Sequence, residues 1–420
     1  MMMMMVHQPF SSSSYSSLSP FFPLQIKSKS FHMFNTPSPY LYLKNNLTLP
    51  LIIHHHFPSP SSLHSSTNTS DDSTSFAVSY LINNFGFSPQ SASKLCSTYH
   101  LRFKTPQNPD SVLAFFRNHG FSDTQLRDII AKSPDLLSCN PSKRVLPKFQ
   151  FFLSKGASTS DIVNLVSKNP RILSLSLENH IVPIYELLHR FLQSEEDTVA
   201  IAIHKPYLLS YNRVPDNITM LVENGVKDST IVRLLRWQSR VLTSSKCYML
   251  ELVEELKDLG FNPSKITFGI ALAAKESVNK TLWKEKVDAF KKWGWSDEDV
   301  LEAFRRQPHC MLASIKKINL VMSFWVNQMG WDVLALAKGP SVFSVSLEKR
   351  IIPRAPVLQF LLKKGLRKKN ASLTYPFIVG DKMFRDKFIN RYEEESSYLL
   401  KLYEEQLTLA HTREDKTDMS

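Results

Sequence analysis

A unit of 36 residues, marked by one glycine and two prolines, repeats along this chain. In its clearest copy, residues 156–188, Gly156 precedes a polar stretch that can cap a helix and an apolar run at helical spacing. Pro170 ends that helix, and Pro183 lies in the first turn of the next one. A unit of this length cannot bury its apolar face alone, so the repeat predicts stacked helical units, a solenoid. The same pattern occurs 36 residues earlier at Gly120, Pro134, Leu137 and Pro147.

The repeat continues toward the C-terminus with variations. The strongest internal echo pairs PRILSLSLENHIVP at 170–183 with PSVFSVSLEKRIIP at 340–353. The unit at 189–224 lacks the leading glycine, and the unit at 260–293 has no proline between its helices. Residues 75–118 predict an atypical first unit that caps the stack. Later units begin at Gly225, Gly260, Gly294 and Gly330, the last with a shortened first helix.

The net charge of +13 is unevenly distributed. Residues 1–70 carry three lysines and no acid, and residues 391–420 carry four bases against eight acids. Residues 71–390 therefore carry the remaining +14. A repeat body with this excess attracts polyanions, and nucleic acid is the commonest such partner.

Residues 1–70 have the composition of an organellar transit peptide. They are rich in Ser and Pro and lack Asp and Glu, so we expect a disordered leader outside the fold. We place the protein in the mitochondrion. The chloroplast is the alternative, because the leader lacks Arg and its serine content also suits a plastid. His54, His55, His56 and His64 in this leader could bind a metal, but a leader that is removed makes this the weaker interpretation.

Nothing in the sequence points to catalysis. We find no GxxxxGK[ST], HExxH or GxSxG motif and no Cys/His set at metal-ligand spacing, so we expect no enzyme, no cofactor and no metal. Asp297, Glu298 and Asp299 follow Gly294-Trp295-Ser296 and fit the first turn of a helix better than an acid–base site. No apolar run is long enough for a membrane span. The four cysteines predict reduced core thiols: Cys96, Cys139, Cys247 and Cys310.

One pattern is carried by Gly120-Phe121-Ser122 with Pro134-Asp135-Leu136-Leu137, Pro170-Arg171-Ile172-Leu173, Pro206-Tyr207-Leu208-Leu209, Gly294-Trp295-Ser296 with Pro308, and Leu347–Pro353. With these segments the chain resembles the mitochondrial transcription termination factor (MTERF) family in its plant-type form, over residues 80–390. The resemblance implies a curved, all-α superhelical solenoid of three-helix repeats. Each repeat would have two longer helices and a short 3₁₀-like helix at its first proline, and the stack would form a basic concave groove. It also implies a role in organelle transcription termination or regulation, intron splicing or ribosomal RNA maturation.

Basic side chains recur at equivalent repeat positions, which a stack would turn into a stripe that contacts phosphates. Ten residues past the first proline lie Arg144 and Arg350, and one residue past the second proline lie Lys148 and Arg354. Three further arginines fall on one face of a helix, where they repel one another unless an anion lies against them. A solvated surface is the alternative for each residue alone. The candidate nucleic-acid-binding residues are Arg144, Lys148, Arg171, Arg233, Arg236, Arg240, Arg350 and Arg354.

Aromatic side chains offer a second way to bind nucleic acid. Tryptophans can stack on unpaired bases, but tryptophans at apolar spacing or beside helix ends more often pack in the core. We therefore expect most of them inside the fold. The tryptophans concerned are Trp237, Trp293, Trp295, Trp325 and Trp331.

These inferences predict three parts: a transit peptide at 1–70, an MTERF-repeat solenoid at 71–390, and an acidic C-terminal helix and tail at 391–420. The expected function is organellar nucleic-acid binding, to double-stranded DNA or RNA, by a monomer without a membrane or small-molecule partner. A helical scaffold that binds proteins is the alternative, although the tetratricopeptide markers are absent. A pentatricopeptide-type RNA reader is a closer rival, and the paired prolines argue against it.

Overall fold

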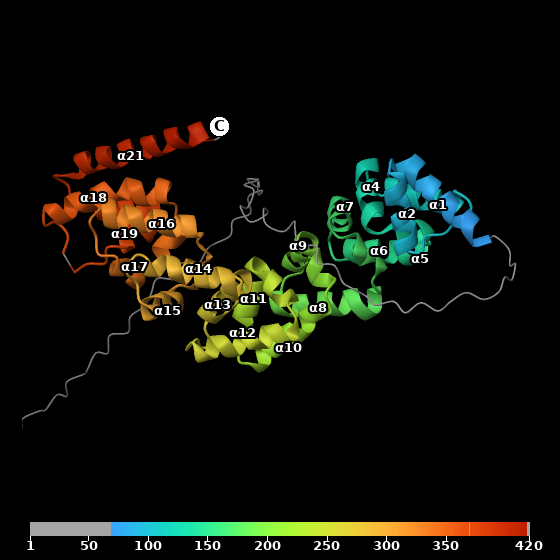
Figure 1. Ribbon diagram of the computed structural model, residues 1–420, viewed down its shortest axis with the longest axis horizontal. Helices are drawn as coiled ribbons and strands as arrows, with labels where there is room; N and C mark the ends of the chain where they lie inside the picture. Colours follow the sequence, from blue (N-terminus) through green and yellow to red (C-terminus); the bar gives the residue numbers. More distant parts are fainter. Residues whose placement is uncertain (1–68, 369, 418–420) are drawn as a thin grey trace, which may run out of the picture. The chain divides into compact units, whose positions relative to one another are not determined.

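The computed structural model describes residues 69–368 and 370–417, with side chains from 74 to 368 and from 370 to 409. Every regular element of this part is a helix, which confirms the predicted all-α helical-repeat fold (Figure 1). No helix of the described part is long and apolar enough to cross a membrane. The predicted leader up to residue 68, with its four histidines, lies outside the described residues.

The elements follow the predicted order. The first unit consists of α1 (Thr69–Phe85), α2 (Pro89–Thr98) and α3 (Gln107–Asn118). The next repeats are α4 (Asp123–Lys132), η1 (Pro134–Ser138), α5 (Pro141–Arg144), α6 (Leu146–Ser154); α7 (Thr159–Lys168), η2 (Pro170–Ser174), η3 (Leu177–Ile181), α8 (Val182–Leu192); α9 (Glu195–His204), η4 (Pro206–Leu209), α10 (Arg213–Glu223); and α11 (Asp228–Trp237), η5 (Ser239–Thr243), α12 (Lys246–Asp258). The remaining elements are α13 (Ile266–Ser277), α14 (Lys280–Lys291); α15 (Asp297–Arg306), η6 (Pro308–Leu312), α16 (Ile315–Ser323), η7 (Phe324–Gln328); α17 (Leu334–Lys338), η8 (Pro340–Ser344), η9 (Leu347–Ile351), α18 (Ile352–Lys363); and α19 (Tyr375–Ile378), α20 (Asp381–Arg385), η10 (Asp386–Asn390), α21 (Ser396–Thr417).

Capping residues fix both ends of the first helix in a repeat. In α7 the Ser158 side chain accepts from the Asp161 backbone N–H, and the Asp161 carboxylate accepts from the Ser158 N–H, which forms a capping box. Gly156, just before this cap, has a φ of +92°, a left-handed conformation that glycine adopts without steric cost. Asn169 at the other end leaves the helical conformation, with a φ of −142° and a ψ of 76°, because the following Pro170 disfavours helical geometry.

The 3₁₀ helix after each first helix carries core residues. In η2 Pro170, Ile172 and Leu173 are buried, and the equivalent residues of η1 and η4 are buried as well. Each repeat packs these residues against the next one, so a single apolar core runs from Ala77 to Phe377. This continuity is the expected consequence of units that cannot bury their apolar faces alone.

Several repeats keep the helical geometry of the others although they lack the glycine or the proline that marks a repeat. Gln193 takes the left-handed position that glycine holds elsewhere, with a φ of 52°. Ser239 replaces the proline, yet η5 still forms and Ser239 is buried. Residues 260–293 form α13 and α14 without a 3₁₀ helix between them, and α17 has only five residues.

The long-range sequence echo is also a structural echo. The segments at 177–181 and 347–351 both form a π-helical turn, η3 and η9, directly before the second helix of the repeat. Each turn begins with a serine, Ser176 or Ser346, whose side chain accepts from a backbone N–H three residues on. Beyond these repeats, α21 packs on α18 around a second apolar cluster that includes Val357, Phe384 and Tyr403.

Candidate nucleic-acid interface

The structure places two of the predicted contact residues inside the fold. Lys148 is 7% exposed, and its ammonium donates to the Arg144 carbonyl oxygen at 2.7 Å. Burial lowers the pKa of Lys148, and the positive charge of Arg144 lowers it further. Arg354 is 1% exposed and donates to the carbonyl oxygens of Pro376 (2.9 Å) and Val379 (2.7 Å). As a correction to the predicted stripe, neither side chain is free to meet a phosphate.

Arg144 and Arg350, at the position ten residues past the first proline, are half-buried. The Arg144 guanidinium forms an ion pair with Asp135 at 2.6 Å and donates to the Leu173 carbonyl oxygen of the next repeat at 3.2 Å. It also donates to the Ser174 hydroxyl at 2.7 Å. These partners give Arg144 a structural role, so the stripe of cations predicted from this position does not form.

Arg144 is instead one of a set of side chains, the interrepeat donors, that donate hydrogen bonds from one repeat to the next. In each case a side chain of one repeat donates to a backbone carbonyl near the 3₁₀ helix, or the corresponding turn, of the next. Such bonds satisfy carbonyls that a helix end leaves without a partner. The donors and acceptors are Asn108 to Leu137, Arg144 to Leu173, His180 to Leu209, Asn217 to Leu242, Lys286 to Met311, and Arg354 to Val379.

Arg233, Arg236 and Arg240 were expected on one helix face, but the structure places them in different surroundings. Arg236 is exposed and pairs with Asp197 of the preceding repeat at 2.6 Å. Arg233 is half-buried and lies near His309, whose pKa is lowered by burial and by the Arg233 charge. Arg240 is exposed but lies in η5, beyond the end of α11, so the expected single face is wrong for this residue.

A row of exposed side chains lies where the first helix of a repeat ends, two residues before the 3₁₀ helix. We call this set the helix-end row. Four members are cations, one is a histidine and one is a tryptophan that follows Arg236. Part of this preference is local, because a cation at the C-terminal end of a helix is stabilised by the helix dipole. The members are Lys132, Lys168, His204, Trp237, Arg306 and Lys338.

Contacts between neighbouring repeats bring these helix ends together. Within two runs, α4–α7–α9 and α11–α13–α15–α17, each helix packs against the next. Asn169, next to Lys168, donates to the Pro206 carbonyl oxygen at 3.3 Å. Lys205, next to His204, donates to the Leu235 carbonyl oxygen at 2.8 Å. The ends of α7, α9 and α11 are therefore adjacent, and a strand that meets one can meet the next.

Within the part of the chain that the structure describes, the lysines of the row have no close partner, although the positive charge of Lys338 helps to lower the pKa of Asp299. Among the described residues, the ammonium groups of Lys132, Lys168 and Lys338 make no ion pair and no hydrogen bond. Arg306 differs, because it pairs with Glu302 on its own helix at 2.9 Å. Unpaired surface cations on adjacent helix ends suit phosphate binding, which needs no specific geometry.

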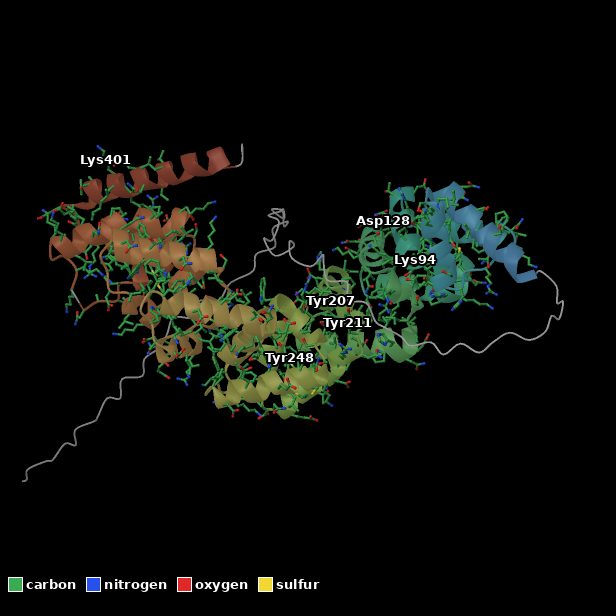
Figure 2. The ribbon with its side chains drawn as sticks, viewed as in Figure 1. Lys94, Asp128, Tyr207, Tyr211, Tyr248 and Lys401 are labelled. Carbon is green, nitrogen blue, oxygen red and sulfur yellow. The ribbon has the colours of Figure 1, made fainter. Side chains whose placement is uncertain are left out.

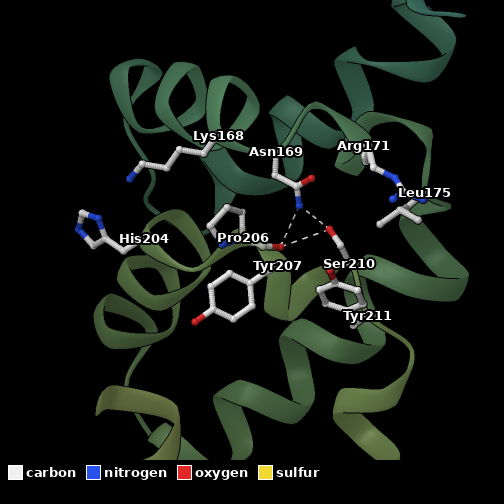
Figure 3. Close-up of a pocket in the computed structure, with 9 residues that line it drawn as sticks. All are labelled: Lys168, Asn169, Arg171, Leu175, His204, Pro206, Tyr207, Ser210 and Tyr211. Carbon is white, nitrogen blue, oxygen red and sulfur yellow. Dashed lines mark hydrogen bonds between the residues drawn. The ribbon is translucent and has the colours of Figure 1, made fainter. Parts of the chain in front are cut away.

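A pocket lies between the ends of α7 and α9, with a volume of about 440 Å³ (Figure 3). Lys168 and His204 of the helix-end row line it, together with Arg171, which is exposed at the start of η2. The rings of Tyr207 and Tyr211, also labelled in Figure 2, line it as well. Of the residues predicted from the sequence, Arg171 is the one that the structure places in this pocket.

The tryptophans divide as expected except for one. Trp295 and Trp325 are 3% and 0% exposed and pack on aromatic neighbours, and Trp293 and Trp331 are partly buried against the core. Trp237 is 76% exposed, in the helix-end row. Trp237 is therefore the exception to the expectation that the tryptophans pack inside the fold.

The carboxylates at 297–299 lie in the first turn of α15, as predicted, and Asp299 completes a capping box. The Asp299 carboxylate accepts from the Ser296 backbone N–H at 2.9 Å, and its hydrogen bonds to Ser296 lower the pKa of Asp299. In the part of the chain that the structure describes, no three His, Cys, Asp or Glu side chains gather where they could hold a metal ion. Three of the four cysteines are buried, and Cys247 is exposed.

The helix-end row was missed in the sequence, although a signal was present. Lys132, Lys168 and His204 follow one another at 36-residue steps, each two residues before a proline. The stripes predicted from the sequence lie after the two prolines of a repeat, whereas this signal lies before the first proline.

The fold and the helix-end row define a helical-repeat protein with a basic edge. A family model described as mTERF matches residues 113–284 and 272–385, more than half of the chain, so this chain belongs to the mTERF family. A stretch of 82 residues is 33% identical to "Transcription termination factor MTERF15, mitochondrial" of Arabidopsis thaliana. The match covers 20% of this chain and 18% of that relative's length.

Proposed function

We propose that this chain binds nucleic acid inside an organelle and regulates organelle gene expression, without catalysis of its own. The helix-end row is the proposed contact surface, joined by Arg171, Arg236 and Arg240 and supported by Arg233 and Arg350. Lys148 and Arg354 are left out because they are buried, and Arg144 because it holds two repeats together. The observation that carries the proposal is the set of exposed cations on adjacent helix ends of an mTERF chain.

The charge of the repeats supports this proposal. Residues 71–390 carry +14, and the unpaired lysines of the row concentrate part of it along one edge of the stack. Polynucleotide phosphates are attracted by such an edge whatever their sequence. The chain then acts either by binding double-stranded DNA, as in transcription termination, or by binding RNA, as in intron splicing.

The proposed location is the mitochondrion, with the chloroplast as the alternative. The relative from Arabidopsis is named as a mitochondrial protein, and residues 1–70 have a leader composition. A fusion of residues 1–75 to a fluorescent reporter tests this point, and import into neither organelle would refute it.

A salt titration tests the binding itself. The full chain is titrated with duplex DNA, structured RNA and an acidic peptide of the same net charge. We expect tight binding to at least one nucleic acid, with an affinity that falls steeply as salt rises, and weak binding to the peptide. Equal affinity for the peptide would favour a protein-binding scaffold and refute the proposal.

A further inference from the structure

The pocket between α7 and α9 has positive charge at two opposite ends. In Figure 3 the Lys168 side chain reaches to one side of the pocket and the Arg171 side chain to the other, with His204 on the Lys168 side. Lys168 and Arg171 are exposed, and within the described part of the chain neither side chain makes an ion pair or a hydrogen bond. None of the described residues that line the pocket is acidic. Charge therefore favours an occupant with a negative group toward each end.

Apart from these cations, most of the lining is apolar. Leu175 and Pro206 supply aliphatic surface, and Tyr207 and Tyr211 supply rings. Tyr211 is 46% exposed, so its ring is open to an occupant. The volume of about 440 Å³ lies in the range of pockets that bind compact ligands, so one large apolar side chain fits.

Hydrogen bonds hold the walls of the pocket in place. Asn169 donates to the Pro206 carbonyl oxygen at 3.3 Å and to the Ser210 hydroxyl at 2.6 Å, which ties the two repeats together. The Tyr207 hydroxyl lies 2.8 Å from the Ser239 hydroxyl of the next repeat, which fixes that ring. Such pre-formed walls lower the entropy cost of binding.

This lining fits a protein segment better than the backbone of a polynucleotide. Tyrosine and arginine are enriched among the residues that contribute most to protein–protein binding. Burial of an apolar side chain against Leu175, Pro206 and the tyrosine rings is favourable, whereas a sugar–phosphate backbone leaves those surfaces without an apolar partner. A protein segment can place a large apolar side chain between two carboxylates, which matches both features of the pocket.

We propose that this pocket is a docking site for an acidic segment of a partner protein. One aromatic side chain of the segment enters the pocket against Tyr207 and Tyr211, and a carboxylate on either side of it meets Lys168 or Arg171. In an extended segment, alternate side chains point the same way and lie roughly 7 Å apart. The carboxylates therefore belong two positions before and two positions after the aromatic residue.

The docked segment also regulates the proposed function. Lys168 and His204 belong to the helix-end row, so a partner in the pocket occupies cations that nucleic acid would contact. The partner segment and a polynucleotide therefore compete for this part of the row. The competition rests on the proposed function, whereas the docking itself does not.

The test titrates the full-length chain with fluorescein-labelled peptides by fluorescence anisotropy. The probe is Gly-Glu-Ser-Phe-Ser-Glu-Gly, and two control peptides have the same net charge. In the first, serine replaces phenylalanine, and the second, Gly-Ser-Ser-Phe-Glu-Glu-Gly, has both glutamates on one side. With one anchor the probe should bind with a Kd between micromolar and millimolar, weaker than nucleic acid. We expect it to bind about tenfold tighter than the first control and about two- to fivefold tighter than the second.

Variants of the chain locate the bound peptide. Tyr211→Ala removes one ring of the pocket and should weaken probe binding at least about fivefold. Lys168→Gln and Arg171→Gln each remove one charge contact and should weaken it about two- to fivefold. Tyr398→Ala removes a tyrosine that is 53% exposed on α21 and should change nothing. Far-UV circular dichroism checks that each variant keeps its helices.

A competition experiment tests the regulation. Unlabelled probe is added to the parent chain bound to a labelled DNA duplex or a labelled single-stranded RNA. We expect the probe to displace the nucleic acid and the serine control, at the same concentration, to displace less.

Several results overturn the inference. Absence of probe binding up to about 1 mM, or equal affinity for the probe and the serine control, refutes the docking site. Unchanged probe affinity in both Tyr211→Ala and Arg171→Gln refutes it as well, because the peptide then binds elsewhere. If the probe docks without displacing nucleic acid, the competition is refuted and the docking site stands. If the chain binds the probe but no nucleic acid, the proposed function fails and the docking site stands.

Discussion

Neutralising three lysines of the helix-end row should weaken the salt dependence of nucleic-acid binding by a predictable amount. Lys132, Lys168 and Lys338 are the residues to change to glutamine, because each is exposed and none has a described ion-pair partner. Arg306 is a poorer choice, since its bond to Glu302 already offsets part of its charge.

The expected change in the salt dependence follows from the number of phosphates that lose a cation. Each contact contributes roughly −0.9 to the slope of log affinity against log salt on a duplex and roughly −0.7 on a single strand. Three lost contacts therefore flatten the slope by about 2.7 on a duplex or about 2.1 on a single strand. Between about 50 and about 200 mM salt, the parent chain should lose affinity about 40-fold or about 20-fold more than the triple variant.

The assay is a series of anisotropy titrations across that salt range. The matched control is a triple variant, Lys94→Gln, Lys284→Gln and Lys382→Gln, which removes the same charge from exposed lysines on α2, α14 and α20, outside the helix-end row. Lys94 is labelled in Figure 2. If both triple variants flatten the slope equally, the row makes no direct phosphate contacts and only the net charge matters.

Three predictions concern stability. Asn217→Ala removes a fully buried donor to two backbone carbonyls and should cost about 2–4 kcal/mol in urea unfolding, and a cost near zero would show that water replaces it. Gly269→Ala should cost roughly 1–3 kcal/mol in the same assay, because the added methyl overlaps the Thr230 side chain where α11 and α13 meet, and an unchanged midpoint would contradict that close approach. Burial lowers the pKa of Lys205 to about 8, below its value in the unfolded chain. Between these two pKa values the unfolded chain binds more protons than the folded chain, so the folded state gains stability as pH rises through that window. The difference in unfolding free energy between the parent chain and Lys205→Gln should therefore grow in favour of the parent above pH 8, and a pH-independent difference would refute the lowered pKa.

The repeat architecture could be predicted because its signals are local. A proline such as Pro170 disfavours helical geometry in the residue before it, and a serine such as Ser158 caps a helix, so much of the three-helix unit follows from single residues. The echo between 170–183 and 340–353 marks two equivalent segments, and the structure shows that both contain a π-helical turn, which the sequence did not predict. Ser239 and Gln193 show that a missing marker is tolerated when neighbouring repeats impose the geometry.

The binding residues were harder to predict because a sequence position does not show which way a side chain points. Arg144 and Arg354 satisfy the spacing of a surface stripe, yet both reach carbonyls of the following segment. The long side chain that makes arginine a phosphate ligand also lets it bond between repeats. Burial and partners decide between these roles, and both depend on the stacking of residues that lie about 30 positions apart.

The interrepeat donors limit how a chain of this kind can change its length. Since Asn108, Arg144 and His180 each complete the hydrogen bonding of the following unit, an insertion within one unit would leave its neighbour with a carbonyl that faces no donor. Adding or losing a whole unit restores the match, because the donor and the acceptor both recur at the same 36-residue step. Relatives with longer or shorter stacks should therefore differ by complete repeats.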